Sequence, residues 1–136
     1  MVRQTIILPV LLATAFNVTA APKPEAVTTL QAQWAQSATQ QPFSAKRGAE
    51  LWRKDGIVQK GNVVRCTTCH GEDLSQQGKH ARSGKVIEPM AFSANPDRFT
   101  QIKKIKKWLK RNCKWTWGRE CTAQEKGDLI EYLVSQ

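Results

Sequence analysis

The chain has 136 residues, with 21 basic and 11 acidic side chains and a formal net charge of +10. This length leaves room for one domain with a limited core and excludes a multidomain architecture. The charge suits an acidic protein partner or an anionic membrane surface, although it can also serve solubility alone. The five tryptophans suit helices that wrap a large flat cofactor, which would supply the apolar contacts that a small core lacks.

Residues 1–20 have the features of an export signal. Arg3 provides a basic start, residues 6–16 are mostly apolar, and residues 18–20 offer small side chains for cleavage. The apolar run is far shorter than the ~20 residues of a membrane-spanning helix, and no other segment could span a bilayer. We therefore expect a cleaved signal peptide at 1–20 and a periplasmic domain at 21–136 that does not span the membrane.

Removal of the signal leaves 20 basic and 11 acidic side chains, a net charge of +9. In the periplasm this charge suits acidic redox partner proteins, and nucleic acid is not an expected partner. The compartment is oxidising, so a disulfide between cysteines can persist there.

Two helices are expected before the first cysteine. Apolar side chains recur at helical spacing in residues 25–38, and Pro42 ends that pattern. Ser44 is a candidate N-cap for a second helix that runs to about Lys54. The packing face of this second helix comprises Gly48, Leu51 and Trp52.

Residues 55–64 should form a loop that leads to Cys66-Thr67-Thr68-Cys69-His70. This spacing lets two thiols reach the vinyl groups of one haem while the adjacent imidazole binds its iron. A dithiol pair or half of a zinc site is the alternative, but seven residues separate Cys113 from Cys121, where zinc pairs usually leave two to four. We predict one covalent haem c on Cys66 and Cys69, with His70 as the proximal ligand.

Residues 72–96 are polar and contain several glycines and prolines, which predicts irregular chain around the haem edge. Within this stretch His80 and Arg82, together with Lys79 and Lys85, are candidates to meet the haem propionates. A solvated loop is the alternative.

Thr100 can cap a third helix that runs to about Arg111. Its apolar stripe comprises Ile102, Ile105, Trp108 and Leu109, of which Trp108 is a candidate haem contact. At 100° per residue, Asn112 falls inside the same stripe if the helix continues that far. The outer side is basic, and we expect it to be either a docking surface or a merely solvated face. Its members are Lys103, Lys104, Lys106, Lys107, Lys110 and Arg111.

Thr122 and Glu125 have the spacing of a capping box at the start of a last helix. The core-facing residues of that helix are Leu129, Ile130, Leu133 and Val134. We expect it to cross the second helix, where Gly48 and Gly127 would permit a close approach.

The second axial position of the iron has three candidate ligands, or none from the protein. Met90 lies 20 residues after His70, which is far enough to reach the other haem face, but it can equally pack against the haem. His80 is better suited to a loop or propionate contact. Asn112 needs a partner on an apolar face, because an unpaired buried amide costs about 1–3 kcal/mol, and the iron or a helix C-cap would satisfy it equally.

The chain resembles the sphaeroides haem protein family of class I c-type cytochromes, from about Leu30 to Leu133. The matching segments are 66–71, 82–85, 95–100, 108–113, 118–122 and 125–126. The resemblance implies an all-α, class I cytochrome c-like domain that wraps one covalent haem.

In that family the asparagine before the penultimate cysteine binds the oxidised iron and leaves on reduction, and the last two cysteines form a disulfide. These roles fall on Asn112, Cys113 and Cys121. Reduction would then open a site for oxygen, nitric oxide or carbon monoxide. The resemblance also implies electron transfer with a dihaem cytochrome c and a membrane b-type cytochrome. Met90 departs from the family, in which an aliphatic residue is usual at this position.

Three functions therefore compete. The first is a redox and diatomic-binding haem protein that is not an enzyme. The second is an ordinary electron carrier ligated by His70 and Met90. The third is a small haem enzyme that acts on oxygen or nitric oxide, for which His80 is the only remaining histidine that could serve as a distal acid or base.

Overall fold

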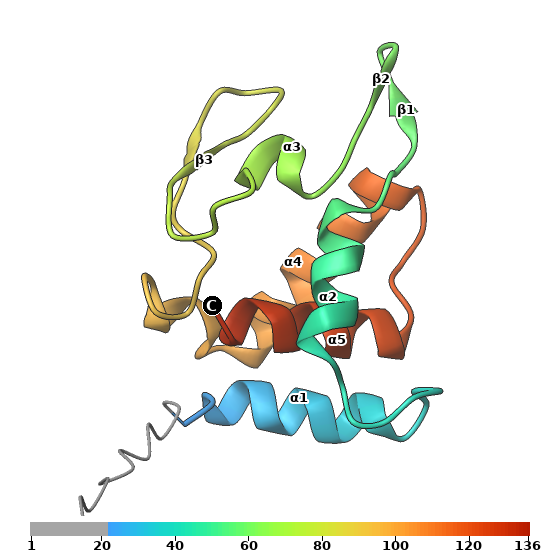
Figure 1. Ribbon diagram of the computed structural model, residues 1–136, viewed down its shortest axis with the longest axis vertical. Helices are drawn as coiled ribbons and strands as arrows, with labels where there is room; N and C mark the ends of the chain where they lie inside the picture. The colour runs from blue at the N-terminus through green and yellow to red at the C-terminus, as the bar shows by residue number, and fades with distance from the viewer. Residues whose placement is uncertain (1–21) are drawn as a thin grey trace, which may run out of the picture.

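The computed structural model describes residues 22–136, so the expected signal peptide at 1–20 lies outside the described residues. The helices of the described part are α1 (Glu25–Ala35), α2 (Ala45–Arg53), α3 (Thr67–His70), α4 (Ile102–Trp117) and α5 (Ala123–Val134). Short elements link them, namely β1 (Val58–Gln59), β2 (Asn62–Val63), β3 (Gly78–Lys79), β4 (Val86–Ile87) and the 3-10 turn η1 (Pro96–Phe99). The expected helical fold is confirmed (Figure 1).

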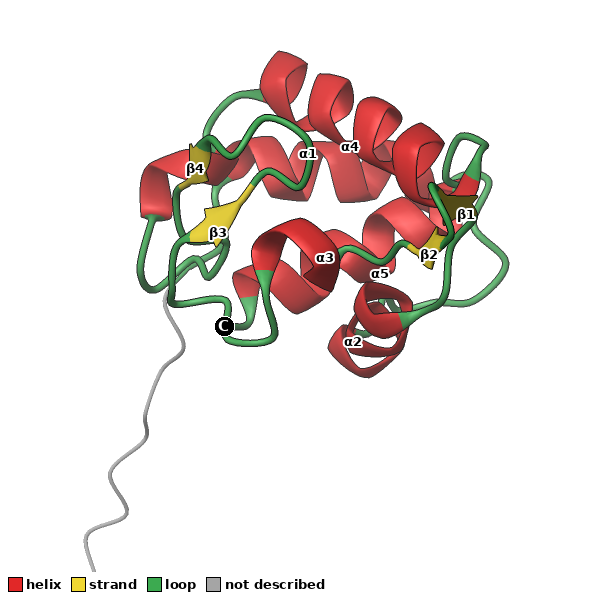
Figure 2. Cartoon of the chain, turned by 90° about the horizontal axis from the view of Figure 1, so that it is seen from above, coloured by secondary structure: helices red, strands yellow, loops and turns green. Residues whose placement is uncertain are grey.

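Helix α5 is the centre of the core, because α1 and α2 both pack against it. Leu30 of α1 and Ile130 of α5 are almost completely buried between these helices. Seen from above, α4 runs along one side of the molecule, with α3 and the β3–β4 hairpin facing it (Figure 2). Helices α1, α2 and α5 therefore form the packed core, and α3 and α4 lie on it with side chains that face each other.

The predicted crossing of the second and last helices is confirmed at Gly48. A Cβ atom at this position would collide with the carbonyl oxygen of Asp128 and with the Cβ atom of Tyr132. Gly127 makes room for a different neighbour, the ring of Phe43. Both glycines carry a conformational cost in a helix, and the close contacts explain why no larger residue stands there.

The carboxylate of Asp128 joins α5 to the start of α2. It is 1% exposed and accepts hydrogen bonds from the backbone N–H of Ser44 at 2.7 Å, from Nε of Arg47 at 2.8 Å and from Nε2 of Gln124 at 2.9 Å. Burial alone would raise the pKa of Asp128, but these hydrogen bonds hold it below its ordinary value. The carboxylate is therefore charged and fully paired at neutral pH.

Two helix starts were predicted correctly from their caps. The side chain of Ser44 accepts a hydrogen bond from the backbone N–H of Arg47 at 3.3 Å and begins α2. Thr122 and Glu125 form the reciprocal capping box at the start of α5. The first helix also begins where predicted, at Glu25, but ends at Ala35, three residues early.

The prediction for α4 was wrong at both ends. Gln101, not Thr100, precedes the helix, because the Thr100 hydroxyl donates instead to the carbonyl of Asp97 at 2.9 Å. The helix continues to Trp117 and ends at Gly118, whose φ of +70° is the left-handed conformation that favours glycine. Asn112 consequently lies in the interior of α4, which excludes its role as a helix C-cap.

The two stretches predicted as loops each contain a short antiparallel hairpin. Val58 pairs with Val63 in the first, and Gly78 pairs with Ile87 in the second. The first hairpin is tied to the end of α4, because the backbone N–H of Ile57 donates to the carbonyl of Thr116 at 2.8 Å. The loop before the first cysteine is thereby fixed against the helix that carries Asn112.

We predict that Asp128→Ala lowers the free energy of unfolding by about 2 to 3 kcal/mol, because it leaves the Ser44 N–H and Arg47 without their charged acceptor. Denaturant unfolding would measure this, with exposed Glu50→Ala as a control that stays near wild type. Because the native pKa lies below 3.8, the contribution is full above that pH and is lost as pH falls through the native value. Equal stability of the two variants would contradict the role of Asp128.

Candidate functional site

A cavity of about 840 Å³ lies between α3, η1, α4 and α5. Its lining is largely apolar, with Trp52, Phe99, Ile105, Leu109, Leu129 and Leu133 among its side chains. Two thiols, two imidazoles, one amide and one thioether also reach it, from Cys66, Cys69, His70, His80, Asn112 and Met90. The fold therefore gathers around one space the residues that the sequence predicted for the haem site, together with Arg82 and Trp108.

The short helix α3 fixes the two thiols and the first imidazole. The backbone N–H of His70 donates to the carbonyl of Cys66 at 3.2 Å, and Gly71 then turns the chain away with a φ of +74°. Gly78 of the β3 strand packs so closely on Cys69 and His70 that a side chain there would collide with their backbone. This contact holds α3 against the β3–β4 hairpin.

His70 has the properties of a neutral metal ligand. Burial, and secondarily the positive charge of Arg98, lower the pKa of His70 to about 4, so the imidazole is uncharged at neutral pH. The ring of Trp52 lies with its centroid 5.3 Å from that of His70. Nδ1 of His70 is buried and has no hydrogen-bond partner among residues 22–136. The neutral ring is therefore held by packing.

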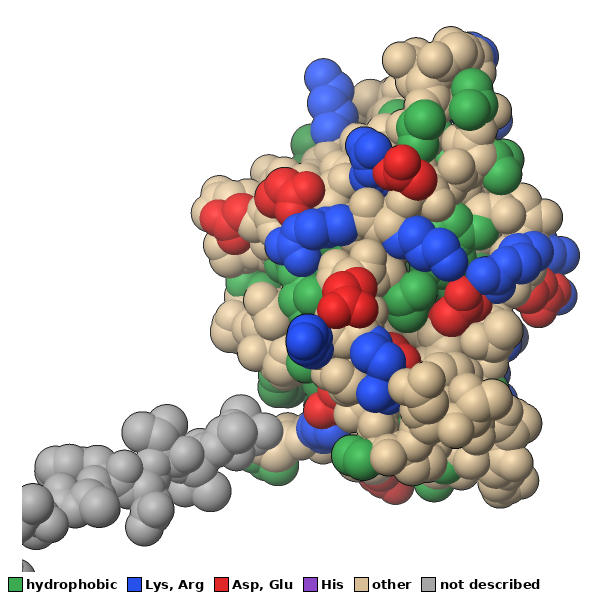
Figure 3. Space-filling model, turned by 45° about the vertical axis from the view of Figure 1, so that its right-hand side comes forward, with side chains coloured by type: hydrophobic (Ala, Val, Ile, Leu, Met, Phe, Trp, Pro, Cys, Tyr) green, Lys and Arg blue, Asp and Glu red, His purple; other side chains and the backbone are tan. Residues whose placement is uncertain are grey.

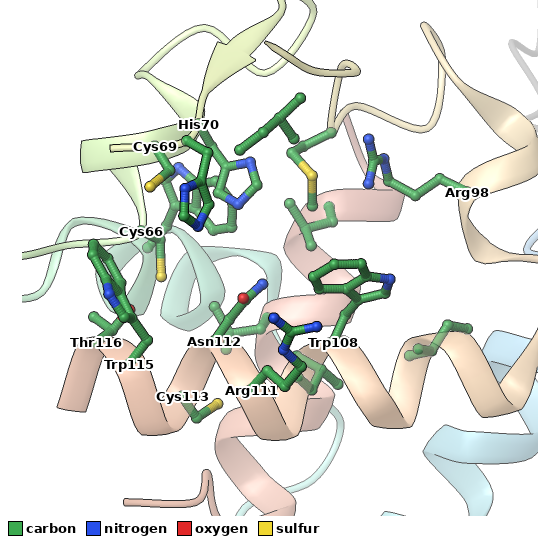
Figure 4. Close-up of a pocket in the computed structure, with 18 of the residues that line it drawn as sticks. Cys66, Cys69, His70, Arg98, Trp108, Arg111, Asn112, Cys113, Trp115 and Thr116 are labelled. Atoms are coloured by element: carbon green, nitrogen blue, oxygen red, sulfur yellow. The ribbon is translucent and has the colours of Figure 1, made fainter. Parts of the chain in front are cut away.

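Asn112 comes from the opposite side. In Figure 4 His70 and the two cysteines lie on one side of the pocket, and Asn112 lies on α4 on the other, with its amide directed into the pocket. Trp108 is one helical turn before Asn112 and is 48% exposed. Asn112 is exposed as well, so the cost of a buried amide, on which the sequence argument relied, does not apply to it in this structure. A group held between α3 and α4 would have His70 on one face and Asn112 on the other.

Met90 and His80 line the same cavity. Met90 is half-buried, and its backbone N–H donates to the carbonyl of Leu74 at 2.9 Å. Nδ1 of His80 accepts a hydrogen bond from the backbone N–H of Ser83 at 3.1 Å. Both side chains stay candidates for contact with a bound group.

The donor set fits a haem better than a zinc ion. Within residues 22–136 no three His, Cys, Asp or Glu side chains cluster as a metal site would require. Burial raises the pKa of Cys66 to about 11, so this sulfur is a protonated thiol at neutral pH. Two thiols beside one neutral imidazole, at the edge of a large apolar cavity, are the arrangement that a covalent haem needs.

Sequence reasoning missed several residues of the cavity, among them Thr116 and Arg98. Thr116 is 2% exposed, and its side chain lies close enough to Cys66 that, against the larger effect of burial, it lowers the pKa of that thiol slightly. Arg98 reaches the cavity from η1 and lies in the segment 95–100 of the family resemblance, but no role was predicted for it. The helical periodicity of α4, extended past Arg111, would have found Thr116.

Cys113 and Cys121 form a disulfide, with their Cα atoms 5.6 Å apart. The bond joins α4, directly after Asn112, to the residue before the cap of α5. Between the two helices, Glu120 forms ion pairs with Lys110 and Lys114, at 3.3 Å each. The segment that carries Asn112 is thus attached to the linker before α5 by a covalent bond and by two ion pairs.

Comparison with known proteins places the chain among c-type cytochromes. A family model described as a domain of unknown function, DUF1924, matches residues 38–133. The chain is 45% identical over 95 residues to cytochrome c-type protein SHP of Cereibacter sphaeroides, which covers 70% of this chain and 73% of that protein. It is 33% identical over 76 residues to cytochrome c'' of Methylophilus methylotrophus, or 56% of this chain and 53% of that one.

Solved structures agree with this result. The structure of oxidised SHP, described as an oxygen-binding cytochrome c, superposes with a TM-score of 0.72 at 40% identity, and covers 85% of this chain and 100% of the other. Oxidised cytochrome c'' superposes with a TM-score of 0.71 at 24% identity, over 82% and 94% of the two chains. The second match shows a similar fold.

We predict that Cys113→Ser with Cys121→Ser lowers the free energy of unfolding by about 2.5 kcal/mol, because the bond closes a loop of nine residues in the unfolded chain. Denaturant unfolding would measure the change. Thiol labelling of the unfolded, cofactor-loaded wild type should find no free sulfur, and two labelled cysteines at 113 and 121 would contradict the bond.

Proposed function

Because this chain belongs to the DUF1924 family and to that of the sphaeroides haem protein, we propose that it is a periplasmic monohaem c-type cytochrome with Asn112 as a labile sixth ligand. In this proposal residues 1–20 direct export and residues 21–136 form the haem domain. Among residues 22–136 the structure has no helix that is both long and apolar enough to cross a membrane.

Cys66 and Cys69 would hold the haem through thioether bonds, and His70 would bind the iron on the same side. A haem supplies a one-electron couple and, where an axial position is open, a binding site for diatomic molecules. Packing of Gly78 against Cys69 and His70 keeps the three attachment residues in one rigid unit. The neutral state of His70 leaves its ring nitrogen available as a ligand.

The position of Asn112 carries the proposal. Asn112 lies within α4, and its side chain projects from the helix into the cavity, across from His70 (Figure 4). A carbonyl oxygen is a hard and weak ligand, which suits ferric iron better than ferrous iron. We therefore propose that the Asn112 oxygen binds the oxidised iron, leaves it on reduction, and so admits oxygen, nitric oxide or carbon monoxide.

Electron transfer and ligand binding, rather than catalysis, fit the remaining side chains. His80 is the only histidine besides His70. Its Nδ1 accepts a hydrogen bond from the backbone N–H of Ser83 and lies 2.9 Å from the Ser83 hydroxyl, so this nitrogen is already engaged within its own loop. The solved structure of SHP is described as an oxygen-binding cytochrome, which favours the same role here.

Replacement of Asn112 tests the proposal against ligation by Met90. We predict that Asn112→Ala changes the ferric optical spectrum and speeds ligand binding, because it removes the sixth ligand. Met90→Leu should leave the spin state of the iron nearly unchanged. Spectra of the oxidised, reduced and carbon monoxide-treated reduced protein would measure both effects.

Mass spectrometry should first show one haem on each variant. If Met90→Leu opens the iron while Asn112→Ala has no effect, the protein is an ordinary carrier ligated by His70 and Met90. If the reduced wild-type protein does not bind carbon monoxide, the proposed open site on the ferrous iron is contradicted.

We also propose that the outer side of α4 is the docking surface for redox partners, among them a dihaem cytochrome c and a membrane b-type cytochrome. This α4 basic face comprises Lys103, Lys104, Lys106, Lys107, Lys110 and Arg111, all exposed, of which Lys104 and Arg111 also line the edge of the cavity. Lys110 already pairs with Glu120, and Lys106 donates to Gln33 at 3.1 Å. On the face drawn in Figure 3, by contrast, basic side chains lie beside acidic ones.

Three lysines of the α4 basic face, Lys103, Lys104 and Lys107, form no ion pair within residues 22–136 and are the best test of docking. We predict that their joint replacement by glutamate slows electron exchange with an acidic partner cytochrome at least tenfold at low salt. The rate of the wild type should fall steeply as salt rises, since the screening length shrinks to about 8 Å at 0.15 M.

Lys46→Glu with Lys60→Glu and Lys126→Glu makes the same change in net charge on other elements and is the matched control. Equal rates for the two triple variants would show that only the net charge matters. A wild-type rate that does not depend on salt would contradict electrostatic docking altogether.

A further inference from the structure

Arg98 is held in place by backbone carbonyls of a preceding segment. Its Nε donates to the carbonyl of Pro89 at 2.8 Å, and its Nη2 donates to the carbonyl of Glu88 at 2.6 Å. The next residue, Phe99, is 3% exposed and anchors η1 in the core. The guanidinium of Arg98 is thus held by two hydrogen bonds, and its backbone is held by the buried side chain of Phe99.

The charge of Arg98 has no carboxylate partner within 4.0 Å among residues 22–136. Glu88 acts on it only at longer range, and burial lowers the pKa of Arg98. A half-buried cation without an anion costs free energy. The fixed guanidinium therefore fits an anion that the chain itself does not provide.

The location of Arg98 indicates which anion. It lines the same cavity as Cys66 and Cys69, and Figure 4 places it on the side of the pocket away from these cysteines. A haem carries its vinyl groups along one edge and its two propionates along the opposite edge. When the cysteines hold the vinyl edge, the propionate edge must point away from them, toward Arg98.

We propose that Arg98 binds a haem propionate and raises the reduction potential of the iron. The inference rests on the covalent haem of the proposed function, but not on Asn112. A guanidinium matches a carboxylate with two parallel hydrogen bonds, and Arg98 keeps unused N–H groups for them. Its positive charge opposes the extra positive charge of the ferric state and so favours reduction.

The cations that the sequence suggested for this role are less well placed. The backbone N–H of Ala81 donates to Sγ of Cys69 at 3.3 Å, so the loop that carries His80 and Arg82 starts at the vinyl edge. Arg82 and Lys85 are exposed, and neither side chain forms an ion pair within residues 22–136. Lys104 and Arg111 of α4 also line the cavity, and Arg111 packs over the ring of Trp108 at 5.0 Å. Arg98 differs from them because two hydrogen bonds to backbone carbonyls fix its guanidinium on the side of the cavity away from the cysteines.

The test compares Arg98→Met, Arg98→Lys and the control Arg82→Met, each purified with its covalent haem. We expect the midpoint potential of Arg98→Met to fall by at least 59 mV, which is a tenfold change in the one-electron equilibrium. Arg98→Lys keeps the charge and should shift the potential less, and Arg82→Met should shift it least. Resonance Raman bands of propionate bending should change in both Arg98 variants, because the paired hydrogen bonds are lost, and should not change in Arg82→Met.

Unchanged propionate bands in either Arg98 variant would overturn the assignment, and so would a potential that shifts equally in Arg98→Met and Arg82→Met. If Arg98→Met does not fold, the bands of Arg98→Lys decide. One haem by mass and carbon monoxide uptake after reduction would show that the proposed function stands even when the Arg98 assignment fails. Their absence in the wild type would instead contradict the proposed function.

Discussion

The continuity of α4 from Ile102 to Trp117 is the constraint on which the site depends. A single helix places Trp108 and Asn112 one turn apart on the cavity side, with Lys104 and Arg111 beside them at the edge of the cavity. Its end is fixed by three interactions of different kinds. Gly118 provides the left-handed turn, Thr116 accepts the hydrogen bond from the β1–β2 hairpin, and the disulfide ties the helix to α5. Without this continuation Asn112 would lie at a frayed terminus.

The features that could be predicted from the sequence are those encoded over a few neighbouring residues. The caps at Ser44 and Thr122 begin α2 and α5 as expected, because a cap needs only a side-chain oxygen and an N–H three residues away. The predicted haem-attachment motif also lies within five consecutive residues, from Cys66 to His70. The resemblance to a known cytochrome family supplied the rest of the expected fold, which the comparisons support.

The features that were missed depend on distant contacts. The last turn of α4 is supported by burial of Thr116 and by a hydrogen bond from Ile57, which is 59 residues earlier in the chain, although Gly118 is a local signal for the end of the helix. The two-residue strands are too short for a periodic signal. Arg98 gains its position from carbonyls of residues 88–89, and no sequence pattern predicts that pairing. Sequence reasoning thus found the attachment side of the site more easily than the opposite edge.

The disulfide next to Asn112 also limits how a ligand at this position can move. The backbone at Cys113 is covalently joined to the segment before α5, and the peptide groups around it are hydrogen-bonded within α4. A side chain anchored in this way can leave a binding partner only by changing its own torsion angles. Such rotamer changes need no rearrangement of the fold and can be far faster than domain motions. Exchange of the ligand would then keep pace with electron transfer.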